Sequence, residues 1–252
     1  MASSDEATAL ARLRERAGAF TASDCEEAAS NGQLECLKYL YEHGCPWDEE
    51  TCWYAAENGH LECLKYLHEH GCPWDEETCW YAAKNGHLEC LKYAHEHGCP
   101  WDEDTCDNVA YHGHLECLKY AHEHGCPWDV WTCRDAASNG QLECLKYLHE
   151  HGCPWNEEMC KNAAEKGHLE CLKYAREHRC PWDKDECIDA ALAYGNTACL
   201  TYMRTLKDAV ESKLDDAMSA LDEIARDIPE GAYVTICAAL KLSHDEHKKR
   251  KR

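Results

Sequence analysis

Apolar and polar positions follow a helical period along most of the chain, and the same pattern returns every 27 residues. One copy opens with DEETCWYAAENG at residues 48–59, where an acidic N-cap candidate precedes helix formers and a glycine closes the segment. The next segment, HLECLKYLHEHG at 60–71, places Leu61, Leu64 and Leu67 on one helical face. The pattern therefore predicts two short helices in each copy, joined by a tight turn.

The sequence CPW ends each second helix. Pro73 fixes its own φ and disfavours a helical backbone at Cys72, so the helix cannot continue. No segment shows the strict alternation of a half-buried strand. A helix pair of this size buries its apolar face only against another copy, so we expect an all-α solenoid of stacked helix-turn-helix repeats with helical caps.

The period also predicts how the chain is divided. Residues 1–20 are expected to form an N-terminal helical cap, and residues 21–205 a repeat array of six full units and a degenerate seventh. Two helical segments at 206–243 are expected to form a C-terminal cap. A basic tail at 244–252 would complete the chain.

Cysteine returns in three columns with the same period of 27 residues. We interpret these thiols as small core residues, because free cysteine is among the most buried residue types. The alternative is a metal-binding or redox-responsive protein, with three thiols and a histidine such as His70 in each copy. The intervals of 11, 9 and 7 residues differ from the short ligand spacings of structural zinc sites. We therefore expect no metal and no cofactor.

The sequence AAENGHLECLKYLHEHG closely resembles the inner part of an ankyrin repeat, and the likeness extends from about Thr21 to Met203. The residues that would form the projecting β-hairpin are missing after Trp74. This shortened Cys-Pro-Trp variety is similar to arrays of large DNA viruses and protists. The resemblance implies stacked helix pairs without β-hairpin fingers. It also aligns the cysteines and the tryptophan after each Cys-Pro with core positions, and His60 with a residue that ties neighbouring loops.

The repeats differ most in the two positions after the first cysteine column. The resemblance places these positions on the face of the first helices that lines the groove of ankyrin arrays. Aromatic pairs there would act as anchors for a partner protein, and polar pairs would set its polarity. Surface drift, or packing of some of these side chains between repeats, is the competing interpretation. The candidate residues are Trp53, Tyr54, Trp80, Tyr81, Asp107, Asn108, Arg134, Asp135, Lys161 and Asn162.

Charge and motifs narrow the functional class. The formal net charge of −22 argues against nucleic acid as the main ligand, since phosphate backbones would be repelled. No window reaches the roughly 18 uninterrupted apolar residues of a membrane span. Every residue that could form a nucleophile and base pair is repeated in each copy, whereas active sites are singular, so we expect no enzyme.

The sequence thus favours a monomeric, non-enzymatic scaffold that binds a protein partner of unknown identity. A designed or consensus array without a natural ligand is a further interpretation, because the copies differ so little. No export signal is evident, so we expect the protein in the cytoplasm. The basic cluster at 248–252 matches a nuclear-localisation pattern, which would direct import instead.

Overall fold

The computed structural model describes residues 4–16, 19–206, 235, 236 and 238. The chain divides into two compact units, Met1–Cys199 and Leu200–Arg252, and each is considered by itself. Within the described residues there are 15 helices and no strand, which confirms the all-α prediction. The helices are α1 (Ser4–Glu15), α2 (Ala22–Ser30), α3 (Leu34–Glu42), α4 (Glu49–Glu57), α5 (Leu61–Glu69), α6 (Glu76–Lys84), α7 (Leu88–Glu96), α8 (Glu103–His112), α9 (Leu115–Glu123), α10 (Val130–Ser138), α11 (Leu142–Glu150), α12 (Glu157–Lys166), α13 (Leu169–Glu177), α14 (Lys184–Ala193) and α15 (Thr197–Thr205).

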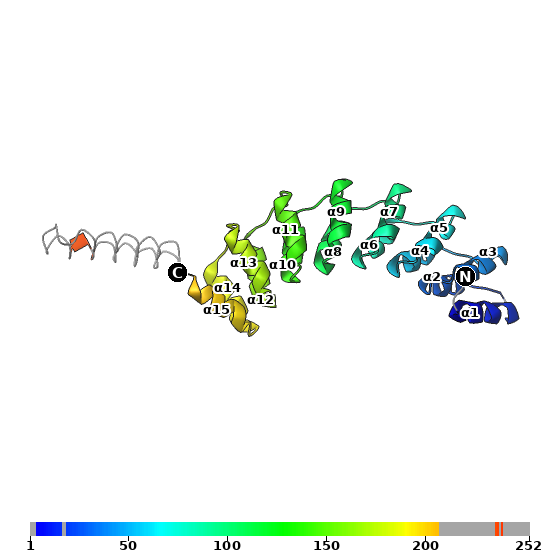
Figure 1. Ribbon diagram of the computed structural model, residues 1–252, viewed down its shortest axis with the longest axis horizontal. Coiled ribbons are helices and arrows are strands. Elements are labelled where there is room, and N and C mark those ends of the chain that lie inside the picture. Colours follow the sequence, from blue (N-terminus) through cyan, green and yellow to red (C-terminus); the bar gives the residue numbers. More distant parts are fainter. Residues whose placement is uncertain (1–3, 17–18, 207–234, 237, 239–252) are drawn as a thin grey trace. The chain divides into compact units, whose positions relative to one another are not determined.

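In the first unit, successive helix pairs stack in chain order, so the predicted solenoid is confirmed. The even-numbered helices from α2 to α14 are the first helices of the repeats, and the odd-numbered helices from α3 to α13 are the second helices. Neighbouring first helices contact one another more extensively than neighbouring second helices. Figure 1 accordingly shows α5, α7, α9 and α11 spread apart. The first helices therefore form the closely packed row of the array.

Glycine is required at the turn inside each repeat. At the end of α4, the amide of His60 donates to the Ala55 carbonyl at 2.8 Å, and that of Gly59 donates to the Ala56 carbonyl at 3.2 Å. This closure places Gly59 at φ +72°, in the left-handed region. A Cβ at Gly59 would also lie 2.5 Å from Nδ1 of His87. Both the backbone conformation and the close approach exclude a larger residue.

The turn histidines tie neighbouring repeats together, as the sequence resemblance implied. Nε2 of His60 is hydrogen-bonded to the Ser30 carbonyl at 3.0 Å, and Nε2 of His114 to the Lys84 carbonyl at 2.9 Å. Each bond satisfies a carbonyl near the end of the preceding first helix, where no intrahelical donor is available. Gln141 makes the equivalent contact, from its Nε2 to the Tyr111 carbonyl at 3.2 Å.

All three cysteine columns are buried, so the prediction that they form the core is confirmed. Exposure ranges from 0% at Cys25 to 6% at Cys45, and the described cysteines are free thiols. The third column also closes the repeat: Sγ of Cys72 donates to the carbonyl of Asp48, the N-cap residue of α4, at 3.2 Å. Leucine and alanine fill the remaining core positions, with Leu64 fully buried.

The tryptophans after Cys-Pro lie outside the core, and that expectation was wrong. They are half-buried and lie flat on a side chain from the last turn of the second helix. The Trp74 ring stacks on His68 with 3.9 Å between centroids, and the Trp47 ring on Tyr41 with 4.6 Å. An aromatic partner on the adjacent turn offers the indole a flat surface, so the ring covers the outside of the loop instead of entering the interior.

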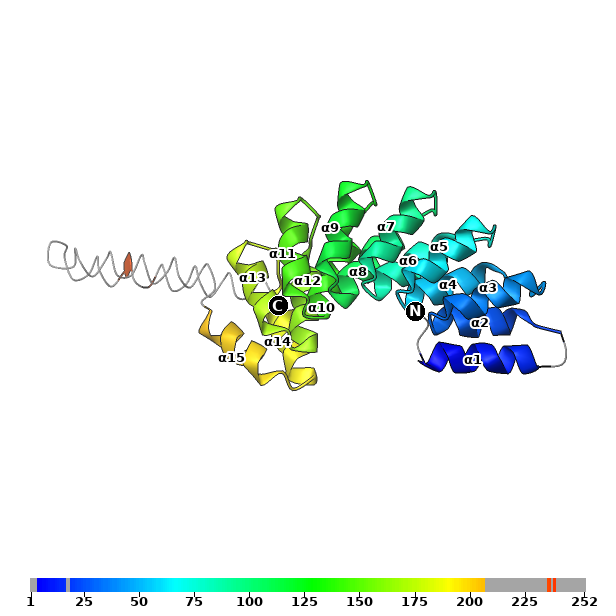
Figure 2. The same ribbon diagram turned by 45° about the vertical axis from the view of Figure 1, so that its right-hand side comes forward.

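The N-terminal helix α1 packs against α3. Glu6 is 8% exposed, and its Oε1 accepts from the amide of Glu35 at 2.8 Å, one of the amides that α3 leaves unpaired at its start. Figure 2 shows α1 running beside α2 and α3. The segments expected to form a C-terminal cap, 206–243, and a basic tail, 244–252, lie almost entirely outside the described residues.

Candidate recognition surface on the first helices

The candidate residues, which differ most in chemistry between repeats, lie in the first helices, on what we term the first-helix face. All of them are half-buried except Lys161, which is exposed. The pairs are Trp53 and Tyr54 on α4, Trp80 and Tyr81 on α6, Asp107 and Asn108 on α8, Arg134 and Asp135 on α10, and Lys161 and Asn162 on α12.

Three of the aromatic rings form one cluster. The Trp53 and Tyr81 rings lie 6.1 Å apart between centroids, and the Trp80 and Tyr81 rings 4.8 Å apart and perpendicular. Nζ of Lys84 lies 4.6 Å from the centre of the Trp80 ring. The structure therefore joins aromatic residues of two neighbouring repeats, Trp53, Trp80 and Tyr81, into what we term the aromatic cluster. Tyr54 is half-buried on the same helix as Trp53.

The aromatic cluster is fixed in position and surrounded by carboxylates. Nε1 of Trp53 donates to Oδ1 of Asp75, the N-cap residue of α6, at 2.6 Å. Burial, and then the nearby carboxylates of Glu57 and Glu77, raise the pKa of Tyr81. The rings are thus held in place at a half-exposed site that several carboxylates border.

Asp107 is held between repeats instead of pointing freely into solvent. Its Oδ1 accepts a hydrogen bond from the Thr132 hydroxyl on α10. Burial raises the pKa of Asp107 to about 6; the Thr132 hydrogen bond opposes this change, and the carboxylates of Asp129 and Asp135 add to it. Packing between repeats, which the sequence left as an alternative, therefore occurs at this position.

Sequence reasoning missed a column of buried threonines, of which Thr132 contacts the first variable position through Asp107. Thr132 follows Asp107 by 25 residues, and the same offset relates Thr78 to Trp53 and Thr105 to Trp80. The hydroxyl oxygens of Thr78 and Thr105 are buried without a hydrogen-bond partner. Their constant spacing of 25 residues from the first variable position was the signal in the sequence that could have identified them.

The other polar candidates also have partners on or between the first helices. The guanidinium of Arg134 donates to Oδ1 of Asp135 at 3.0 and 2.8 Å, and its Cζ lies 4.2 Å from the Trp131 ring centre. Nζ of Lys161 lies 3.3 Å from Oε2 of Glu186 on α14. Asn108 and Asn162 each donate from Nδ2 to a carbonyl one turn earlier in their own helix, at 2.8 and 2.9 Å.

A second feature that the sequence did not reveal is an aromatic ladder on the second helices. Nδ1 of His95 is hydrogen-bonded to the Tyr120 hydroxyl at 3.1 Å, and the His95 ring stacks on Trp101 with 3.7 Å between centroids. The His122, Tyr147 and Trp128 side chains repeat this arrangement. The ladder joins each second helix to the next, so its residues are explained by packing.

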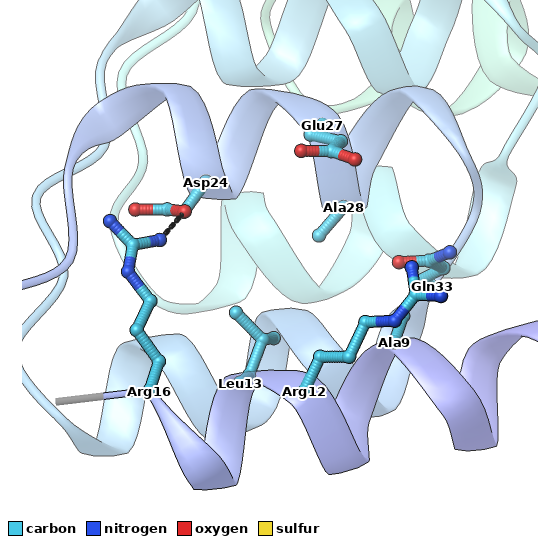
Figure 3. Close-up of a pocket in the computed structure, with 8 residues that line it drawn as sticks. All are labelled: Ala9, Arg12, Leu13, Arg16, Asp24, Glu27, Ala28 and Gln33. Atoms are coloured by element: carbon cyan, nitrogen blue, oxygen red, sulfur yellow. Dashed lines mark hydrogen bonds and ion pairs between the residues drawn. The ribbon is translucent and has the colours of Figure 1, made fainter.

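Cavities in the first unit are small. One of about 210 Å³ lies between α1 and α2; Figure 3 shows Arg12 and Gln33 at one end and the ion pair of Arg16 with Asp24 at the other. A second, of about 310 Å³, lies between the starts of α12 and α14. It is lined by Glu157, Glu158, Lys161, Asp183 and Glu186. Neither cavity brings together a nucleophile and a base.

The described residues form neither a metal site nor a membrane span. Among the residues that the structure describes, no three histidine, cysteine, aspartate or glutamate side chains are placed to hold a metal ion together. Burial raises the pKa of the Cys63 thiol to about 12 and that of Cys117 to about 11, which opposes the thiolate form that metals bind. None of the helices in the described part is long and apolar enough to cross a membrane.

The fold and the first-helix face define the class: a solenoid of helix pairs with a variable surface on one row. Two overlapping segments, 26–104 and 52–132, match the family model for ankyrin repeats, described as three copies. This part of the chain therefore consists of ankyrin repeats, and the resemblance read from the sequence is confirmed.

Comparison with solved structures supports the same fold. The crystal structure of the human ASB11 ankyrin repeat domain is similar with a TM-score of 0.60 at 18% sequence identity, over 73% of this chain and 99% of that chain. No curated protein matches the sequence. Ankyrin repeats are in general protein-protein interaction modules and are typically non-enzymatic. The narrower likeness to viral and protist arrays stays a prediction.

Proposed function

We propose that the protein is a non-enzymatic scaffold that binds a partner protein along the first-helix face. Trp53, Tyr54, Trp80 and Tyr81 serve as anchors, and the polar pairs on α8, α10 and α12 adjust the polarity of the surface. The observation that carries this proposal is the aromatic cluster, since large half-exposed rings gathered on one face are typical of binding hot spots.

The contacts of the polar pairs refine the proposal. Asp107 is engaged with Thr132, so its contribution to a partner is indirect. Lys161 is exposed, and its ion pair with Glu186 is weak enough in water to be exchanged for a partner's carboxylate. The aromatic pairs therefore supply affinity, and the polar pairs at the other end of the row supply selectivity.

The experiment is affinity capture from the native cell with a fourfold variant, in which Trp53, Tyr54, Trp80 and Tyr81 are replaced by Ala. Loss of the hot spot should weaken the captured complex by more than about 2 kcal/mol. Trp74→Ala is the matched control, because that half-buried ring lies on the outer loop. Equal capture by the fourfold variant and the wild type would refute the proposed surface.

We further propose that residues 21–205 form the binding array between caps at 1–20 and 206–243. In this proposal the protein acts as a monomer and does not bind nucleic acid. Cytoplasmic residence, or nuclear import through 248–252, is tested by imaging a fluorescent fusion with and without those residues. Sedimentation velocity tests the monomer.

A further inference from the structure

Lysine and arginine side chains of this chain indicate which kind of ligand the first-helix face binds. Nζ of Lys84 lies 4.6 Å from the Trp80 ring centre and 5.8 Å from that of Tyr81. On α10, the Arg134 guanidinium lies over Trp131, an exposed ring, at 4.2 Å. In both places a positive charge rests on the electron-rich face of a ring. Aromatic rings on two first helices are thus already used as cation sites.

One part of the aromatic cluster is left available. Lys84 lies close over Trp80, at 4.6 Å, and farther from Tyr81, at 5.8 Å, whereas none of the cation-ring contacts found among the described residues involves Trp53. Trp53 is held by its bond to Asp75 and faces Tyr81 at 6.1 Å with a tilt of 32°. The two rings therefore present a fixed, half-exposed aromatic surface beside the occupied one.

The charge around this surface selects the ligand. The carboxylates of Glu50, Glu57 and Glu77 all act on the Tyr81 phenol, and the whole chain carries a formal charge of −22. An approaching cation is attracted by this field, and an anion is repelled. A purely apolar segment would desolvate these carboxylates without compensating them, which costs free energy.

We propose that Trp53 and Tyr81 bind a cationic segment of the partner polypeptide, with a lysine or arginine side chain lying over the two rings. The inference rests on the proposed function and adds the chemistry of the partner to it. Neighbouring carboxylates pair with further cations of the segment, so recognition combines ring contact with salt-sensitive attraction.

The test uses defined peptides and fluorescence anisotropy. A labelled peptide of alternating lysine and alanine, about nine residues long, spans roughly 30 Å when extended, enough to cross three neighbouring first helices. Peptides with glutamate or with leucine in place of lysine are the comparisons. We expect the lysine peptide to bind, more weakly as salt increases, and the glutamate peptide not to bind.

The matched variant takes its residues from the chain itself. The variant combines Trp53→Asp with Tyr81→Asn. Asp is the residue that α8 has at the first variable position, as Asp107, and Asn is the residue that α8 has at the second, as Asn108. The change removes both rings and adds a negative charge. Attraction by charge alone would then increase, whereas we expect binding of the lysine peptide to weaken by about tenfold. Circular dichroism checks the fold, and Trp74→Ala is expected to bind like the wild type.

Each other outcome overturns the inference in a recognisable way. Equal binding of the lysine peptide to wild type and variant would mean unspecific attraction to an acidic surface. Binding of the leucine peptide alone, lost in the variant, would keep the face as a docking surface but refute its cationic ligand. If no peptide binds, the cationic inference fails, while the proposed function is decided separately by capture of the native partner.

Discussion

The hydroxyl of Thr132 donates a hydrogen bond to the carboxylate of Asp107 across the boundary between two repeats. In the two preceding repeats the position of Asp107 is taken by Trp53 and Trp80, and the matching threonine hydroxyls have no partner. A side chain at the first variable position can therefore contact the next repeat as well as solvent. A substitution there changes the contact between repeats together with the surface offered to a partner.

The first prediction concerns the pH dependence that Asp107 causes. Its pKa is raised from 3.8 to about 6, mainly by burial, so between these values the folded state binds more protons than the unfolded state. The contribution of Asp107 to the free energy of unfolding therefore falls as pH rises from 3.8 to about 6. Asp107→Asn keeps an acceptor for Thr132 but does not titrate. After allowance for solvent screening, the variant should be more stable than the wild type above pH 6 by about 1 kcal/mol.

Urea unfolding at several pH values measures this difference. The advantage of Asp107→Asn should shrink as pH falls from about 6 towards 3.8. Asp189→Asn, at an exposed position of α14, serves as the control and should show no such change. An advantage of Asp107→Asn that is the same at all pH values would contradict the assigned protonation.

The threonine column yields a second prediction. Thr105→Val removes a buried hydroxyl without a partner and keeps the shape of the side chain, so it should raise the free energy of unfolding by about 1 kcal/mol. Thr132→Val leaves the Asp107 carboxylate without its donor and should lower that free energy by about 1–3 kcal/mol. Denaturant unfolding of the two variants compares the same substitution in neighbouring repeats. If Thr105→Val and Thr132→Val lowered the free energy of unfolding equally, the Thr105 hydroxyl would have a hydrogen-bond partner.

The repeat pattern was sufficient to predict the helix pairs and the buried cysteines. Leu64 and Leu67 share a helical face with Cys63 beside them, and every copy repeats this apolar stripe, so its burial follows from the sequence alone. The contacts between copies could not be predicted in the same way. Whether Thr132 contacts Asp107, or Trp74 covers His68, depends on the offset and angle between neighbouring helices. Side-chain packing sets that geometry, and the period of the sequence does not.

The third prediction concerns acid sensitivity of the second helices. Burial, and then the facing rings of His124 and His151, lower the pKa of His95 and His122. Their stabilising effect is complete above pH 6.5, and it is lost as pH falls below 6.5, because the unfolded chain takes up protons first. Thermal unfolding of the wild type should therefore shift to lower temperature over this range.

The chain suggests the matched variant for this test. Tyr41 occupies the same column as His122 and stacks on Trp47 with 4.6 Å between centroids, so a tyrosine preserves the stack without titrating near neutral pH. Replacing His95 and His122 by Tyr should reduce the shift in melting temperature between pH 7 and pH 5. His70→Tyr, an exposed position, is the control. If the double variant loses as much stability on acidification as the wild type, the ladder is not the acid-sensitive element.

The last prediction concerns the thiols. Burial raises the pKa of Cys90 to about 12 and that of Cys171 to about 11, so almost no thiolate forms in the folded state at pH 8. Cys237 lies outside the described residues, and Cys237→Ser removes it from the measurement. In this variant a thiol-specific disulfide reagent should label the native protein only as fast as the array unfolds, and all 20 described cysteines after denaturation. Stoichiometric labelling that is faster than unfolding would place reactive thiols at the surface and revive a redox role.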